Sequence, residues 1–265
     1  MSFLALALVG LAVGVTTVLF GFGGGFVTVP VIAVADAALG GDALRVATAT
    51  SALVMLVNAA VATLATRREV LRRLTGRWAL FVLLAAGGAV GAGMARFAPA
   101  AIIRWGFVLY IGATIIDLLV RPGFFGRSHS GPSPAPAGSL GIGRSLGLPI
   151  GSIAAFLGVG GSVMTVPLMR RAGASMPVAA SLSNPLTLVI IAPALAVSLL
   201  LRGSTPAAAG LVGSVDVVAA LALLIGSIPT VVVLRRRPPH IPDGVHAWTY
   251  LGLLVAAGVT VGVTG

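Results

Sequence analysis

Ten runs of mostly apolar residues follow one another along the chain, separated by short polar or glycine-rich segments. Six of these runs approach the length of about 20 residues that a helix needs to cross a bilayer. The other four form two pairs, 2–20 with 26–39 and 145–157 with 163–169, and a glycine cluster divides each pair. Run 145–157 would give about 20 Å of helix, short of a hydrocarbon core of about 30 Å. The pattern therefore predicts an all-α integral membrane protein in which each pair forms a hairpin of broken helix.

The two glycine clusters belong to an internal repeat at an offset of 137 residues. Residues 20–30 are FGFGGGFVTVP and residues 157–167 are LGVGGSVMTVP, with six of eleven positions identical. A helix with a polar start follows each copy, ATATS at 47–51 and AASLSN at 179–184. The chain is therefore expected to contain two repeats, each a broken hairpin followed by about three transmembrane helices. Their expected bounds are 1–120 and 145–265, joined by a Pro/Ser/Gly linker at 121–144.

The composition agrees with a protein solvated by lipid. Apolar residues make up 58% of the 265 positions, and only 9% are Asp, Glu, Lys or Arg, against about 25% in soluble domains. All 17 basic residues are arginines that lie mostly between the apolar runs. Membrane-flanking loops explain this net charge of +11 better than nucleic-acid binding, which would place a basic stripe along one face.

The distribution of the arginines predicts the orientation of the two repeats. If each broken pair enters and leaves on one side, the halves are inverted, and 13 arginines lie on one side and four on the other. If each pair is one continuous span, the numbers become nine and eight. Loops on the cytoplasmic side carry an excess of arginine and lysine. We therefore expect inverted repeats in the cell membrane, with both termini outside and the arginine-rich loops in the cytoplasm.

The glycine breaks have a chemical consequence. Lipid cannot form hydrogen bonds to a broken backbone, so a break at membrane depth must be satisfied by protein or by a polar cavity. The helices that start after the breaks, at Phe26 and Val163, would present unpaired N–H groups and the positive end of the helix dipole. Two such starts, approaching from inverted repeats near the bilayer midplane, predict an anion site without a buried cation.

Candidate substrate-binding residues are the glycines, hydroxyls and amides nearest to these helix starts: Gly23, Gly24, Gly25, Thr28, Thr50, Ser51, Gly160, Gly161, Ser162, Thr165, Ser183 and Asn184. The alternative for each hydroxyl or amide is a hydrogen bond between helices. For glycines outside the breaks we favour close helix packing: Gly10, Gly14, Gly87, Gly88, Gly91 and Gly93.

Ionisable residues inside the apolar runs are few. Asp216 is a candidate proton carrier, and the alternative is a residue near the outer interface. The three histidines do not cluster along the chain, and with no cysteine we expect no metal site, no cofactor and no catalytic acid–base pair. A transporter is therefore favoured over an enzyme. The expected partners are a small anionic substrate and the lipid bilayer. The sequence does not decide whether the chain forms a homo-oligomer.

The repeated motifs GFGGGFVTVP and GVGGSVMTVP, with the alanine-threonine-serine helix start, resemble the TauE/SafE family of sulfite exporters and sulfonate permeases. The resemblance spans essentially the whole chain. It implies a secondary carrier of small sulfur-containing anions (sulfite, thiosulfate, organosulfonate or sulfoacetate) driven by an ion gradient. It also implies that the glycine breaks and the Thr50–Ser51 region line the substrate path. Two departures from the family pattern, Ser162 in place of a third glycine and Leu182-Ser183-Asn184 in place of a threonine-serine pair, suggest unequal half-sites. A passive anion channel and a non-catalytic subunit of a membrane complex are the alternatives.

Overall fold

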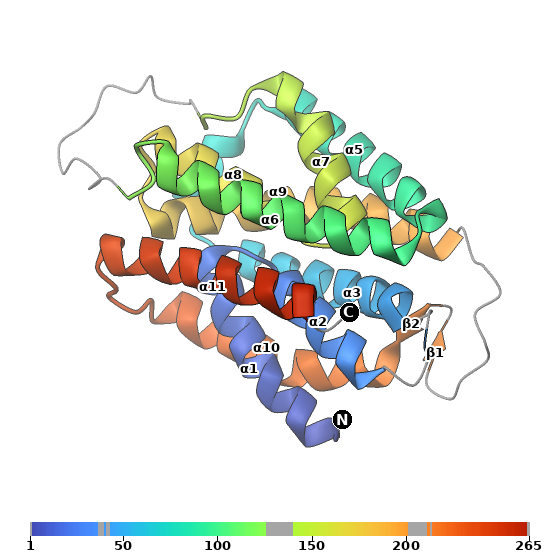
Figure 1. Ribbon diagram of the computed structural model, residues 1–265. Coiled ribbons are helices and arrows are strands. Elements are labelled where there is room, and N and C mark those ends of the chain that lie inside the picture. Colours follow the sequence, from blue (N-terminus) through green and yellow to red (C-terminus); the bar gives the residue numbers. More distant parts are fainter. Residues whose placement is uncertain are drawn as a thin grey trace.

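The computed structural model describes residues 2–36, 40, 43–125, 140–200, 211–212 and 214–263, and these are mostly helical (Figure 1). Most of the expected linker and Arg202 lie outside the described residues. In chain order the elements are α1 (Phe3–Phe20), α2 (Gly25–Ala35), α3 (Ala43–Leu64), α4 (Arg68–Leu71), η2 (Arg72–Leu74), α5 (Trp78–Phe97), α6 (Ala100–Val120), η3 (Arg144–Leu146), α7 (Gly147–Leu157), α8 (Ser162–Arg171), α9 (Met176–Leu200), β1 (Leu211–Val212), β2 (Val215–Asp216), α10 (Val217–Arg236) and α11 (Asp243–Val263).

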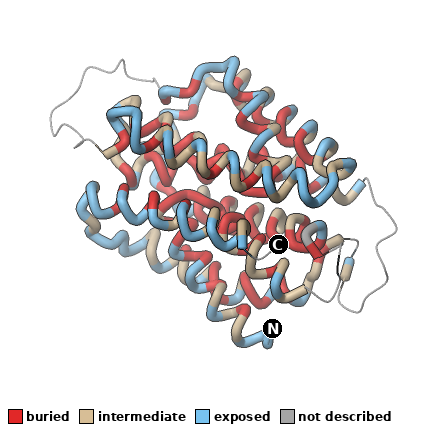
Figure 2. The backbone as a smooth tube through the Cα atoms, viewed as in Figure 1, coloured by how far each residue is buried: buried red, intermediate tan, exposed pale blue. Residues whose placement is uncertain are grey.

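Seven of the described helices are long and apolar enough to cross a membrane: α1, α3, α5, α6, α9, α10 and α11. Large apolar side chains on their outer faces are exposed, among them Phe97 at 82% and Leu109 at 71%, which suits contact with lipid. Buried residues concentrate between the helices (Figure 2). The chain is therefore a multi-pass membrane protein.

The structure adds one helix to the six predicted spans and shortens another. α1 alone reaches 18 apolar residues, although the sequence pattern had assigned it to a broken pair. The apolar run at 207–234 does not form one helix, because β1 and β2 pair antiparallel before α10 begins at Val217. Asp216 marks this transition, since its carboxylate accepts a hydrogen bond from the Ala219 N–H at 2.9 Å and caps α10.

The helices pack in two groups, each containing members from both halves of the chain. One group holds α1, α2, α3 and α10, and the other holds α5, α7, α8 and α9. The groups meet along α3 and α9, and α6 packs against α11 (Figure 1). The penultimate long helix of each half thus packs with the broken pair of the other half.

Glycines allow backbone contact within both groups. A β-carbon at Gly14 of α1 would lie 2.7 Å from the Ser227 carbonyl oxygen of α10, and one at Gly151 of α7 would overlap the Leu84 carbonyl of α5. These packing glycines extend the repeat N-terminal to the breaks, because Gly10 and Gly14 align with Gly147 and Gly151 at the offset of 137. The packing prediction is wrong only for Gly93, where a β-carbon would meet no atom within 4 Å.

The same contacts give the relative direction of these helices. Positions 10 and 14 of α1 meet positions 223 and 227 of α10, so the two helices run parallel. Positions 147 and 151 of α7 meet positions 80 and 84 of α5, so this pair also runs parallel. α1 therefore begins at the same end of the molecule as α10, and α7 begins at the same end as α5.

One end of the molecule, which we call the arginine end, is held together by ion pairs. Arg171 of α8 bonds the Asp117 carboxylate of α6 at 2.7 Å, and Arg170 bonds the Asp243 carboxylate of α11 at 2.6 Å. The Arg170 guanidinium also donates to the Phe124 carbonyl at 2.6 Å. These contacts gather the last turns of α6 and α8 with the first turn of α11.

Different contacts hold the opposite end, which we call the Asp216 end. The N–H of Asp216, before α10, donates to the Thr50 hydroxyl of α3 at 2.9 Å. Arg104 near the start of α6 donates to the Gly262 carbonyl near the end of α11 at 2.7 Å. The first turns of α6 and α10 and the last turn of α11 therefore lie at this end.

Candidate functional site

Both predicted helix breaks are present. Residues 21–24 separate α1 from α2, and residues 158–161 separate α7 from α8. The first and third residues of each break are glycines with positive φ angles: 72° at Gly21, 63° at Gly23, 69° at Gly158 and 70° at Gly160. Side chains strongly disfavour this left-handed region, so glycine is what allows both chain reversals.

The two breaks meet around one pair of residues in the protein interior. A β-carbon at Gly23 would lie 3.3 Å from the Thr187 methyl and 3.6 Å from the Met55 side chain. A β-carbon at Gly160 would lie 3.2 Å from the same methyl, 3.4 Å from the Met55 sulfur and 3.7 Å from the Phe22 carbonyl oxygen. Equivalent glycines of the two breaks thus contact the same residues of α3 and α9.

The long helix of each half also packs against the break of the other half. Gly158 of the second break faces α3, with the Thr48 methyl 3.3 Å from its β-carbon position. Gly21 of the first break faces α9, with the Ala180 carbonyl oxygen at 2.6 Å. Both breaks are therefore enclosed by residues that are distant in the chain.

The helix starts after the breaks are buried and uncapped. Neither N-cap residue, Gly24 for α2 or Gly161 for α8, supplies a side-chain hydrogen bond. The first N–H groups of a helix have no partner inside the helix, and they carry the positive end of its dipole. All residues of 21–25 and 158–162 are buried. Two sets of amide donors therefore face the protein interior.

Hydroxyl groups at the first break are paired with one another. Thr28 and Ser51 share a hydrogen bond of 2.5 Å, and Thr28 also donates to the Gly24 carbonyl at 3.1 Å. Near this break the amide nitrogen of Asn58 lies 3.4 Å from the β-carbon position of Gly24 and has no hydrogen-bond partner among the described residues.

Hydroxyl groups at the second break are unpaired. Ser162, Thr165 and Thr187 are fully buried, and none of their hydroxyls finds a partner in the described part of the chain. Buried polar groups are hydrogen-bonded in the large majority of cases. Three free hydroxyls next to uncapped amides thus form a set of donors suited to the oxygens of an anion.

Ser183 and Asn184 lie on the α1 side of the first break. The Ser183 hydroxyl donates to the Ala180 carbonyl at 3.0 Å and lies 3.4 Å from the Gly21 carbonyl. The Asn184 amide donates to Ala180 at 3.0 Å, and its side-chain oxygen has no partner among the described residues. The second half thus contributes polar groups to the first break.

Thr50 and Asp216 are not brought to the breaks. They bond one another at the Asp216 end, as described above. Asp36, which follows α2, lies in the electrostatic range of Asp216. Burial raises the pKa of the Asp36 carboxyl above its ordinary value of 3.8, and the Asp216 carboxylate raises this pKa further. An acidic pair therefore stands at this end of the molecule.

An aromatic cluster, which the sequence pattern did not reveal, covers the breaks. The Phe22 ring stacks on Phe26 with centroids 5.0 Å apart and lies 5.1 Å from the Tyr250 ring of α11. The Tyr250 hydroxyl donates to the Val163 carbonyl at 3.3 Å. Because Phe22 and Tyr250 are fully buried, an anion could reach the amides only after a rearrangement.

The sequence pattern predicts a basic, proline-rich turn at 235–244, whereas the structure places Arg235 in the last turn of α10. Its guanidinium donates to the Ser181 hydroxyl of α9 at 2.5 Å. Two of its other nitrogen atoms are buried without a hydrogen-bond partner among the described residues. A desolvated cation of this kind attracts anions. Its position follows from the tertiary arrangement that brings the last turn of α10 within reach of Ser181, which no local sequence pattern reports.

The fold therefore defines a polytopic membrane protein with two broken helices meeting in its interior, the architecture that transporters use for small-ion sites. Among the described residues, no three His, Cys, Asp or Glu side chains could hold a metal ion. The chain belongs to the sulfite exporter TauE/SafE family, whose family model matches residues 6–261. No curated protein and no solved structure matches it.

Proposed function

We propose that the protein is a secondary transporter of small sulfur-containing anions, of the sulfite, sulfonate, sulfoacetate or thiosulfate class. One observation carries the proposal: uncapped helix starts and the free hydroxyls of Ser162, Thr165 and Thr187 surround the point where Gly23 and Gly160 meet. Amide and hydroxyl donors can match the oxygens of a sulfite or sulfonate group. Membership of the sulfite exporter TauE/SafE family supports a sulfur-containing anion as the substrate.

The two halves are proposed to be inverted repeats. α1 is parallel to α10 and begins at the Asp216 end, whereas α7 is parallel to α5 and begins at the arginine end. α2 returns to Asp36, within the electrostatic range of Asp216, and α8 returns to the ion pairs of the arginine end. Each broken pair therefore enters and leaves at one end, and the ends differ between the halves. This supports the arginine end as cytoplasmic and the termini as outside.

Transport is proposed to proceed by alternating access around the breaks. Both breaks are buried and covered by Phe22 and Tyr250, so neither end has open access to the amides. Movement of one helix group against the other would open them to each side in turn. Arg235, with its free N–H groups, would receive the anion on the arginine side. Asp216, with Asp36 beside it, would carry the coupled proton at the other end.

Uptake of radiolabelled sulfite into proteoliposomes tests the site. We expect T165V/T187V to raise the KM for sulfite by tenfold or more, because each lost hydrogen bond to a charged group is worth about 1.5–3 kcal/mol. The matched control is T249V/T260V, since each of these two exposed hydroxyls donates to a backbone carbonyl of its own helix. Equal KM values for both variants would show that the Thr165 and Thr187 hydroxyls do not bind the anion. Counterflow of unlabelled sulfite separates a carrier from a passive channel.

A further inference from the structure

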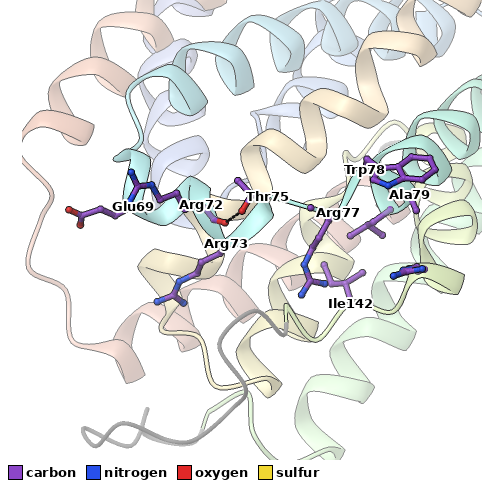
Figure 3. A pocket seen from close by; sticks show the side chains of 11 residues that line it. Glu69, Arg72, Arg73, Thr75, Arg77, Trp78, Ala79 and Ile142 are labelled. Carbon is purple, nitrogen blue, oxygen red and sulfur yellow. Dashed lines mark hydrogen bonds between the residues drawn. The ribbon is translucent and has the colours of Figure 1, made fainter.

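A basic cleft lies at the arginine end, apart from the helix breaks. It has a volume of about 680 Å³ and lies between the segment 69–80 and the residues before α7 (Figure 3). Four arginines line it: Arg72, Arg73, Arg77 and Arg144. None of the candidate residues at the breaks lines this cleft. It is therefore a separate feature of the molecule.

Among the described residues, the four guanidinium groups have no anionic partner. Within the described part of the chain, none of them forms an ion pair or a side-chain hydrogen bond. The acidic residue of the lining is Glu69. Its carboxylate extends away from Arg73 and Arg77, which reach to the same side of the loop (Figure 3). Arginines elsewhere at this end, such as Arg171, are paired with carboxylates. Four like charges repel one another, and an anion in the cleft would relieve this repulsion.

The cleft opens where the protein meets lipid. Trp78 lines it and is 72% exposed at the first position of α5. Val82, one turn further, is 56% exposed on the same helix. Tryptophan is enriched at the membrane–water interface, where its ring lies at the level of the headgroups. The arginines are therefore placed at the depth at which phospholipids carry their phosphate.

From this geometry we infer that the cleft binds a phosphate group, supplied by the headgroup of an anionic phospholipid. Arginine matches phosphate oxygens with two parallel N–H groups, and basic pockets on the cytoplasmic side of membrane proteins suit such headgroups. The exposed Trp78 ring beside the arginines favours a lipid over a free ion, since a soluble phosphate would gain nothing from a ring at lipid depth. The inference rests on the membrane location of the chain and on the proposed cytoplasmic position of the arginine end, and it does not depend on the transported anion.

Lipid retention by the purified full-length protein tests the inference. In detergent micelles containing phosphatidylglycerol and phosphatidylcholine, native mass spectrometry should show selective retention of phosphatidylglycerol. We expect R73Q/R77Q/R144Q to weaken this retention at least tenfold. The matched control R68Q/R236Q/R237Q removes the same charge from exposed arginines outside the cleft and should retain the lipid. The single variant R77Q, with an intermediate loss, keeps the test valid if the triple variant does not fold.

Inorganic phosphate is the second probe and separates the two sources of the group. At millimolar concentration it should neither displace phosphatidylglycerol nor raise the melting temperature. Displacement by phosphate, or stabilisation that is lost in R73Q/R77Q/R144Q, would overturn the assignment to a lipid. Equal retention by the cleft variant and the control would overturn the site itself. Sulfite uptake, measured in parallel, shows whether the proposed transport site is intact in each variant.

Discussion

At the scale of single residues, the two breaks are chemically unequal. Thr28 and Thr165 occupy equivalent positions, yet Thr28 is paired with Ser51 and Thr165 is unpaired among the described residues. Gly25 of the first break corresponds to Ser162 of the second, which adds another free hydroxyl. The second half therefore supplies most of the free hydroxyl donors. That the two half-sites bind the substrate unequally stays a prediction, to which this difference in free hydroxyls adds support.

The Asp36 carboxyl gives a prediction of pH dependence at this scale. Its pKa is raised in the folded protein, so the folded state keeps a proton that the unfolded chain has already released. The stabilisation is complete below about pH 3.8 and is lost as the pH rises through the higher folded pKa. We expect D36N to flatten this part of the stability profile, measured by thermal unfolding in detergent from about pH 4 to about pH 7. The control E69Q, which removes an exposed carboxyl, should leave the slope as it is. An unchanged slope in D36N would contradict the assignment.

At the scale of elements, glycines let the backbones of neighbouring helices approach closely. At Gly14, α1 lies so close to α10 that an added β-carbon would overlap a carbonyl oxygen of α10. At Gly151, α7 approaches α5 in the same way. Small residues at helix interfaces are typical of membrane proteins, because lipid provides no hydrophobic force between helices. These contacts fix the positions of the two breaks, since α1 and α7 each end at one of them.

Substitution of Gly151 tests this packing. A β-carbon there would overlap the Leu84 carbonyl, which is backbone and cannot rotate away. We expect G151V to lower the free energy of unfolding by about 3 kcal/mol, at the upper end of overpacking costs, and to reduce sulfite uptake by displacing the second break. The control G252V lies at an exposed position of α11, where a β-carbon would meet no atom within 4 Å. Unfolding in detergent with a denaturant compares the two, and equal stabilities would show that α7 tolerates separation from α5.

At the scale of the whole molecule, the segregation of charge defines two ends. The ion pairs of Arg170 and Arg171 and the basic cleft lie at one end, and the Asp216 cap lies at the other. Unequal arginine content across a membrane sets the orientation of its proteins. The proposed inverted arrangement, in which each broken pair returns to the end from which it started, agrees with this segregation of charge.

Cysteine labelling tests this orientation directly, because the chain has no native cysteine. Arg237 lies at the arginine end after α10, and Ala100 lies at the opposite end at the start of α6; both are exposed. We expect an impermeant maleimide to label A100C in intact cells and R237C only after permeabilisation. Labelling of both residues from the same side would contradict the proposed orientation. The unmodified chain serves as the blank.

The sequence by itself determined the breaks, most of the spans and the repeat. These features are local: apolar runs must lie in lipid, and positive φ angles at Gly21 and Gly158 favour glycine wherever they occur. The constant offset of 137 residues between the two copies identifies the repeat from the sequence alone. The packing glycines before the breaks also follow this offset, although the aligned motifs begin only at residues 20 and 157.

Only the tertiary structure decided which residues surround the breaks. Met55 and Thr187 contact both Gly23 and Gly160 because helices from opposite halves pack together. Arg235 of α10 reaches Ser181 of α9, a contact within the second half. Thr50 was expected at the breaks and instead faces the N–H of Asp216. Contacts between residues more than 100 positions apart depend on how helices rotate and cross. Hydrophobic patterning fixes which face of a helix is buried, but it does not specify which distant residue that face will meet.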